Sequence, residues 1–162
     1  MPSLDKLTHL PFTGLQGQIY RCPMPFGDYD FEGQGLAEML QQHVDVVVML
    51  VSDQEALEKS RRNLRQLYRQ QGLQVIQLPV SDFGVPERAA LDVALQQTAA
   101  LARQGQNIAV HCSAGIGRTG LFMAELARLA MNMDGAASIN WVRRYIHGAI
   151  ETEAQVRFIM EA

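Results

Sequence analysis

The sequence predicts an α/β protein with a central, mostly parallel sheet flanked by helices. Two observations predict this fold class. Short apolar runs alternate along the chain with longer segments of helical periodicity. The short runs are rich in β-branched residues and apolar at consecutive positions, as in strands that are covered on both faces. The length of 162 residues suits one domain, so we expect residues 1–162 to form a single domain.

Four segments are predicted to be strands. The clearest is 44–51 (VDVVVMLV), because a run of this length and composition fits a strand buried on both faces of a parallel sheet. The other three are 17–22, 74–80 and 107–112, each bounded by turn-forming residues. A glycine-rich loop joins the last of these strands to the next helix and completes the expected fold.

Helical periodicity predicts six helices. The second begins at an expected capping box, with Ser52 as the N-cap and Glu55 at the third helical position, and ends near Gly72. We therefore interpret Asp53 and Glu55 as helix-capping residues rather than pocket residues. The expected helices are 36–43, 52–72, 87–103, 117–132, 135–147 and 151–161.

Composition argues against several classes of partner. The formal net charge is −3 and the pI is near 5.8, which argues against nucleic acid or an anionic membrane as the main partner. No apolar stretch has the length of a membrane span, and no targeting signal is recognisable. These features predict a soluble, cytoplasmic monomer.

The cysteine content predicts neither a disulfide scaffold nor a metal site. The chain has two cysteines, Cys22 and Cys112, and no CxxC pair, so neither a metal nor a cofactor is expected. This usage is typical of a reduced, intracellular protein. Cys22 has two interpretations: a buried free cysteine, or a resolving cysteine that protects oxidised Cys112 as a disulfide.

One motif carries the chemistry. Residues 111–120 read HCSAGIGRTG and join a predicted strand to a predicted helix. Gly115 and Gly117 allow several backbone N–H groups to converge on one point, and the helix N-terminus adds partial positive charge. Such a loop binds a tetrahedral oxyanion, and Arg118 supplies a planar fork for two phosphate oxygens. The competing phosphate loop, GxxxxGK(S/T), does not fit because arginine precedes Thr119.

Cys112 stands at the mouth of this loop, where positive surroundings favour the thiolate. A thiolate that faces a bound phosphate is a nucleophile directed at phosphorus. The Thr119 hydroxyl is expected to hydrogen-bond the Cys112 sulfur and ease its departure in a second step. His111 precedes Cys112 on a strand, so its side chain should point away from the phosphate and hold the loop rather than act as a general base. The predicted substrate-binding residues are Ser113, Ala114, Gly115, Ile116, Gly117 and Arg118.

The string resembles the signature of the cysteine-based protein phosphatases, HCxxGxGR(S/T)G. Ser113, Ala114 and Ile116 resemble the tyrosine-specific branch, whereas the short chain resembles the compact dual-specificity group and its atypical and kinase-associated members. The resemblance implies a phosphocysteine intermediate and no metal. It also implies a general-acid aspartate on a mobile loop about 30 residues before the cysteine. Asp82, in the segment VSDFGVP, lies 30 residues before Cys112.

The same resemblance implies a glutamine that positions water in the second step, within a Gln-Thr-x-x-Gln arrangement. Here the corresponding segment, 151–155, reads ETEAQ. Gln155 is carried over as the candidate, with a surface glutamine as its alternative. Glu151 replaces the first glutamine, and whether Glu151 or Gln155 positions the water stays open.

These residues predict a phosphoprotein phosphatase that hydrolyses phosphotyrosine, with phosphoserine and phosphothreonine left open as further substrates. Its partner would be a phosphoprotein or phosphopeptide. One alternative is a phosphatase for inositol phosphates or phosphoinositides, which favour lysines in the loop, whereas positions 113, 114 and 116 are neutral. Another is a non-catalytic phosphate-binding module, although such a module would lack one of the three chemical groups at Cys112, Arg118 and Asp82.

Overall fold

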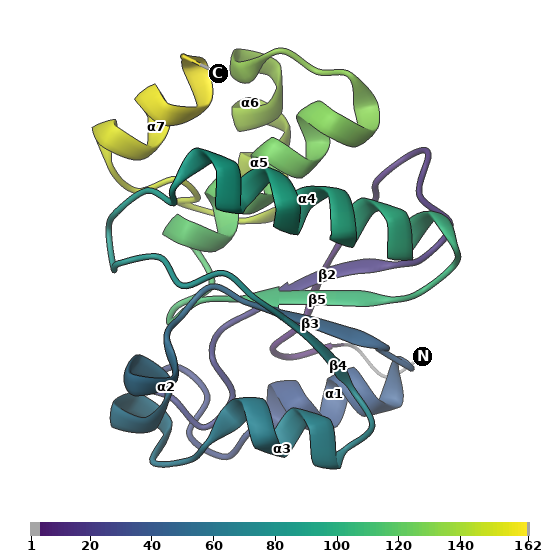
Figure 1. Ribbon diagram of the computed structural model, residues 1–162, viewed down its shortest axis with the longest axis vertical. Coiled ribbons are helices and arrows are strands. Elements are labelled where there is room, and N and C mark those ends of the chain that lie inside the picture. Colours follow the sequence, from purple (N-terminus) through teal and green to yellow (C-terminus); the bar gives the residue numbers. More distant parts are fainter. Residues whose placement is uncertain (1–3, 162) are drawn as a thin grey trace.

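Five strands form one sheet in the order β1-β2-β5-β3-β4 (Figure 1). The computed structural model describes residues 4–161. All neighbouring pairs are parallel except β1 and β2, which are antiparallel. The predicted α/β fold with a mostly parallel sheet is confirmed. The strands are β1 (Thr8–Leu10), β2 (Ile19–Cys22), β3 (Val46–Met49), β4 (Gln74–Gln77) and β5 (Ile108–His111).

Helices cover both faces of the sheet (Figure 1). The first three lie on one face and the last four on the other. Within residues 4–161, none of them has the length and apolar character that crossing a membrane requires. They are α1 (Gln34–Gln41), α2 (Asp53–Ser60), α3 (Leu64–Gln70), α4 (Arg88–Arg103), α5 (Gly117–Met131), α6 (Gly135–Tyr145) and α7 (Glu153–Met160).

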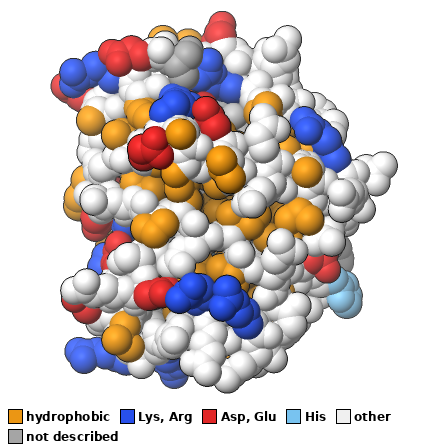
Figure 2. All heavy atoms as spheres, in the orientation of Figure 1, with side chains coloured by type: hydrophobic (Ala, Val, Ile, Leu, Met, Phe, Trp, Pro, Cys, Tyr) orange, Lys and Arg blue, Asp and Glu red, His pale blue; other side chains and the backbone are white. Residues whose placement is uncertain are grey.

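The two central strands lie entirely in the core. Every residue of β3 and of β5 is buried, because helices cover both faces of the sheet, and this explains why their sequences are apolar without alternation. On the face shown in Figure 2, hydrophobic side chains gather across the middle, and charged side chains lie mainly above and below them.

The predicted helix over residues 52–72 is wrong in one respect, because it is two helices. α2 ends at Ser60, and its C-cap residue, Arg61, has a left-handed φ of 61°. The Asn63 side chain then accepts a hydrogen bond from the backbone N–H of Gln66 at 3.1 Å and begins α3. Asparagine is a strong N-cap, so it favours a new start within an otherwise helical run.

The strand β1 was not predicted. It has three residues and pairs only with β2, at the edge of the sheet. A strand of three residues is too short to show the alternation of apolar and polar residues by which a strand is recognised in a sequence. The other elements lie within the predicted segments or differ from them by a few residues at their ends.

The topology brings four loops together at one edge of the sheet. The last residue of β5, His111, is level with Cys22 at the end of β2 and Met49 at the end of β3. The segments that follow these strands and β4 therefore meet at the carboxyl edge, which is where open parallel sheets bind ligands.

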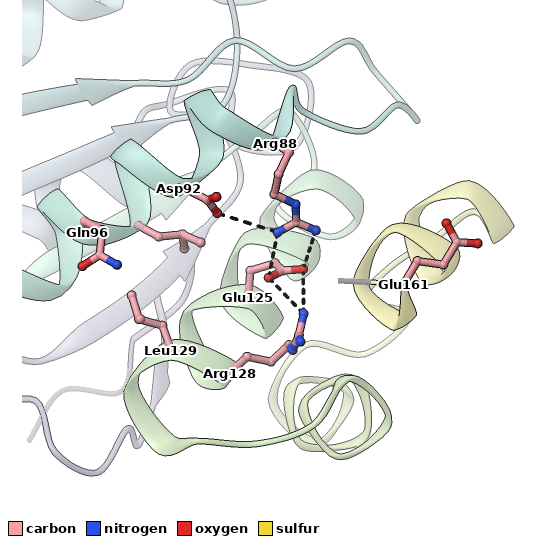
Figure 3. A pocket seen from close by; sticks show the side chains of 8 residues that line it. Arg88, Asp92, Gln96, Glu125, Arg128, Leu129 and Glu161 are labelled. Atoms are coloured by element: carbon pink, nitrogen blue, oxygen red, sulfur yellow. Dashed lines mark hydrogen bonds and ion pairs between the residues drawn. The ribbon is translucent and has the colours of Figure 1, made fainter.

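α7 is held at its C-terminal end by an ion cluster around the buried Glu125 (Figure 3). Glu125 of α5 is only 5% exposed, and its carboxylate lies 3.3 Å from Arg88 and 3.4 Å from Arg128. The same guanidinium groups donate to the carbonyl groups of Phe158 and Ile159 on α7. Since Arg88 is the first residue of α4, the cluster joins the start of α4 to the end of α7.

Candidate active site

The segment between β5 and α5 forms a tight loop that requires glycine at position 115 and brings Gly117 close to α7. Gly115 has a φ of 78°, and a Cβ there would collide with the Arg21 guanidinium and the Cys22 carbonyl. A Cβ on Gly117 would collide with the carboxylate of Glu151. Glycine is required at position 115 because the backbone there is left-handed and is closely approached by the Cys22 carbonyl.

Arg21 holds this loop from the outside, and the sequence did not indicate it. Its Nη2 donates to the carbonyl oxygen of Ala114 at 2.9 Å, and its Nε donates to that of Gly115 at 3.0 Å. Because these two carbonyl groups face Arg21, the backbone N–H groups of the loop face in other directions. Gly115 N–H points at the Cys112 sulfur, with an N–Sγ distance of 3.3 Å.

Cys112 lies at a pocket of about 240 Å³. Its side chain is almost fully buried. The predicted hydrogen bond from the Thr119 hydroxyl to this sulfur is not formed in the structure. Thr119 Oγ1 is buried and has no hydrogen-bond partner among residues 4–161, and the Gly115 N–H approaches the sulfur instead. The pocket is lined by Asp28, Tyr29, Lys59, Asp82, Phe83, Cys112, Ser113, Ala114, Arg118 and Glu151.

His111 is buried beneath the loop and does not line the pocket. Burial lowers its pKa to about 4, so the imidazole is neutral at pH 7. Its Nδ1–H donates to the carbonyl oxygen of Cys112 at 2.9 Å, and the Tyr68 hydroxyl donates to its Nε2 at 2.8 Å. These partners fix one tautomer and hold the loop at Cys112. Tyr68, on α3, had no signal in the sequence that linked it to this site.

Replacing Tyr68 by phenylalanine should lower the free energy of unfolding by about 1–3 kcal/mol, because His111 Nε2 would remain buried without a donor. Thermal unfolding would show this as a lower Tm. Tyr29→Phe is the matched control, since the Tyr29 side chain is exposed and its change should stay within about 0.5 kcal/mol. Equal stability of Tyr68→Phe and the wild type would show that this hydrogen bond does not stabilise the loop.

Arg118 is buried, and a carboxylate from α2 fixes its guanidinium. Its two Nη atoms donate to the two carboxylate oxygens of Glu55 at 2.8 and 2.9 Å, and Nη1 also donates to the carbonyl of Val80 at 2.8 Å. Burial lowers the pKa of Arg118, but the Glu55 hydrogen bonds and the surrounding negative charges, those of Glu55 and Asp82 included, together outweigh it and raise that pKa. The guanidinium is therefore charged and held in one orientation.

The interpretation of Glu55 as only a capping residue is wrong. The Ser52 hydroxyl does accept a hydrogen bond from Glu55 N–H at 3.1 Å, as a cap requires. The Glu55 carboxylate, however, turns to Arg118 and to Lys59, whose Nζ lies 2.9 Å away. Two hydrogen bonds to a buried guanidinium are stronger than the single bond to the N-cap N–H that a capping box would form. The Glu55 carboxylate therefore binds Arg118.

Asp82 reaches the same pocket from the loop after β4. Its Oδ1 lies 3.2 Å from Arg118 Nη2 and its Oδ2 lies 3.6 Å from Lys59 Nζ. The Asp82 side chain is 45% exposed, so it stands at the mouth of the pocket rather than at its base. Lys59 was missed by the sequence analysis, although it lies one helical turn after Glu55 and thus on the same face of α2.

Gln155 is buried beside the pocket and does not line it. Its Nε2 donates to the Gly84 carbonyl at 3.1 Å, and its Oε1 accepts from the backbone N–H groups of Glu151 and Thr152. The alternative of a surface glutamine is therefore wrong, and the amide is engaged in a capping box and in the Asp82 loop. Glu151, not Gln155, contributes its side chain to the pocket.

Cys22 is fully buried, and burial raises the pKa of its thiol to about 12. The thiol therefore stays protonated at neutral pH. The buried free cysteine fits this environment, and the resolving role in oxidation stays a prediction.

Comparisons with known proteins point to one family. The family described as "Polymorphic toxin system, DSP-PTPase phosphatase" matches residues 30–130, more than half of the chain. An uncharacterized protein of Methanocaldococcus jannaschii, MJECL20, is 34% identical over 86 residues, which are 52% of this chain and 56% of that protein. Tyrosine-protein phosphatase corkscrew of Drosophila virilis is 39% identical over 98 residues, which are 50% of this chain and 13% of that protein. The chain thus spans about half the length of the first relative and a small part of the second.

The solved structures show the same fold. Kinase associated phosphatase, with a serine in place of its catalytic-site cysteine, superposes with a TM-score of 0.86. The match covers 99% of this chain and 95% of that chain at 19% sequence identity. At this identity the likeness concerns the fold.

Proposed function

This chain belongs to the cysteine-based protein tyrosine phosphatase superfamily, as a compact member of the dual-specificity type, and from this premise we propose that it hydrolyses phosphotyrosine in phosphoproteins. One observation carries the proposal: Cys112 and Arg118, from the segment between β5 and α5, and Asp82, from the loop after β4, line a single pocket of about 240 Å³. Cys112 is the nucleophile, Arg118 binds the phosphate oxygens and Asp82 donates a proton. A non-catalytic binding module would need only Arg118.

In the first step, the Cys112 thiolate attacks phosphorus. The S–P bond forms, the P–O bond to the substrate breaks, and Asp82 gives its proton to the leaving oxygen. Loop N–H groups and Arg118 stabilise the equatorial oxygens. A phosphate that reaches Arg118 competes with Asp82 for Nη2, which frees the Asp82 carboxyl group to face the leaving oxygen.

In the second step, water attacks the phosphocysteine. The new O–P bond forms, the S–P bond breaks with return of the thiolate, and the proton of the water goes to the Asp82 carboxylate. The chemistry uses no metal or cofactor. In this proposal His111 positions the loop and Gln155 positions the Asp82 segment, each through the hydrogen bonds described above.

Aromatic side chains at the mouth support an aryl phosphate. Tyr29 and Phe83 both line the pocket, and each is 58% exposed. Aromatic pairs in offset or edge-to-face arrangements stabilise each other beyond the burial of their area. A phosphotyrosine ring that reaches Cys112 passes these two side chains, whereas phosphoserine offers no ring to contact them.

The proposal is tested by metal-free phosphate release from a panel of substrates in the presence of a chelator. We expect the phosphotyrosine peptide to be hydrolysed faster than the phosphoserine and phosphothreonine peptides of the same sequence, because only its ring contacts Tyr29 and Phe83. Inositol phosphates complete the panel. Faster release from an inositol phosphate than from any peptide would replace the proposed substrate class with the alternative one, and no release from any member would contradict the enzymatic function.

A further inference from the structure

Two carboxylates without partners stand at the pocket that holds Cys112. Asp28 lies in the loop between β2 and α1, and Glu151 directly precedes the N-cap of α7. Both residues are exposed and both line the pocket. In the part of the chain that the structure describes, neither carboxylate accepts a hydrogen bond or forms an ion pair, so both charges face the solvent at the mouth.

The two cations of the pocket are already engaged. Arg118 and Lys59 both contact Glu55, and both lie within 3.6 Å of Asp82. The lining therefore holds three carboxylates against two cations, and a further carboxylate lies directly behind the cations. The charges of Arg118 and Lys59 are thus balanced by Glu55 and Asp82, whereas the charges of Asp28 and Glu151 at the mouth are not balanced.

Glu151 lies close to the phosphate loop itself. Its carboxylate occupies the space that a Cβ on Gly117 would fill. Any group attached to a phosphate on the loop must therefore pass near this charge. The pocket has dimensions comparable with the Debye length, which is about 8 Å at physiological salt. Dissolved salt therefore screens the Glu151 charge only partly across the pocket.

Resting on the proposed function, we propose that Asp28 and Glu151 determine the substrate class of this pocket: phosphopeptides that carry lysine or arginine next to the phosphorylated residue. A flanking cation would pair with the unpartnered carboxylates. A second phosphate, or an aspartate or glutamate beside the phosphorylated residue, would meet like charge and be disfavoured.

The test uses three phosphotyrosine peptides of equal length, flanked by arginine, alanine or glutamate. We expect the wild-type kcat/KM to be about tenfold or more higher for the arginine peptide than for the glutamate peptide. Each exposed ion pair contributes up to about fivefold, and the peptide meets two carboxylates. The double variant Asp28→Asn/Glu151→Gln should bring this ratio close to one. Asp92→Asn is the matched control, because it removes an exposed carboxylate that does not line the pocket and should keep the wild-type ratio.

Dissociation constants of the same peptides for Cys112→Ser protein separate this inference from the proposed function, because binding does not need turnover. Selective binding of the arginine peptide without hydrolysis by the wild type would contradict the proposed function and support the role of the two carboxylates. Hydrolysis with equal kcat/KM for all three peptides would overturn the selectivity and keep the phosphatase. A preference that survives in the double variant would also overturn it, and absence of both binding and hydrolysis would overturn both.

Discussion

Cys112→Ser protein should release phosphate from phosphotyrosine peptides about 10⁴- to 10⁶-fold more slowly than the wild type, the scale seen when a covalent nucleophile is removed. Serine has nearly the same shape, but its hydroxyl is a far weaker nucleophile than a thiolate. Arg118 and the loop N–H groups remain in place, so the variant should still bind inorganic phosphate. Release kinetics measured alongside phosphate titration calorimetry separate loss of chemistry from loss of binding.

The second cysteine supplies the control for this prediction. Cys22 is buried and its thiol has a pKa of about 12, so it cannot serve as a nucleophile at neutral pH. Cys22→Ala should retain the wild-type kcat at a temperature where it stays folded. Comparable activity losses in the two variants would point to damaged folding, and a fully active Cys112→Ser protein would exclude the phosphocysteine mechanism.

Asp82→Asn should lower kcat for phosphotyrosine peptides by about 10²- to 10⁴-fold, the usual contribution of a positioned proton donor. The loss should shrink for aryl phosphates whose phenol is strongly acidic, because such a leaving group departs without a proton. The variant also removes the carboxylate that lies 3.2 Å from Arg118, so its affinity for inorganic phosphate should not fall. A series of aryl phosphates with graded leaving-group acidity, assayed in both proteins, measures the difference.

The leaving-group series is its own control, since protein and pocket stay the same throughout. An equal loss of kcat across the series would assign Asp82 a structural role. A loss that is accompanied by weaker phosphate binding would indicate instead that Asp82 helps to order Arg118.

The sequence predicted the phosphate loop because its information is local. Within ten residues, Gly115 and Gly117 set the backbone, and Cys112 and Arg118 provide the chemistry. Buried strands of the parallel sheet were equally recognisable, because continuous burial leaves a continuous apolar run, as at Val46–Met49. Such local patterns can be recognised without knowing which residues contact them in the folded chain.

The supports of the loop were not predictable in the same way. Glu55 contacts Arg118 across 63 residues, Arg21 contacts Ala114 across 93, and Tyr68 contacts His111 across 43. Each of these side chains has an ordinary local explanation, as a helix residue, a strand residue or a core aromatic. Only the tertiary fold shows that they meet, and a single sequence carries no record of such pairing.

The loop that carries Asp82, which the family resemblance implies to be mobile, is hydrogen-bonded to α7 in this structure. The Gln155 amide donates to the carbonyl of Gly84 and the Thr152 hydroxyl donates to that of Phe83, so protein groups alone join the Asp82 segment to the start of α7. The conformational entropy of this segment is therefore lost when the chain folds rather than at every encounter with substrate. Under the proposed function, we therefore expect the rate of turnover to depend on the chemical steps and not on closure of this segment over the substrate.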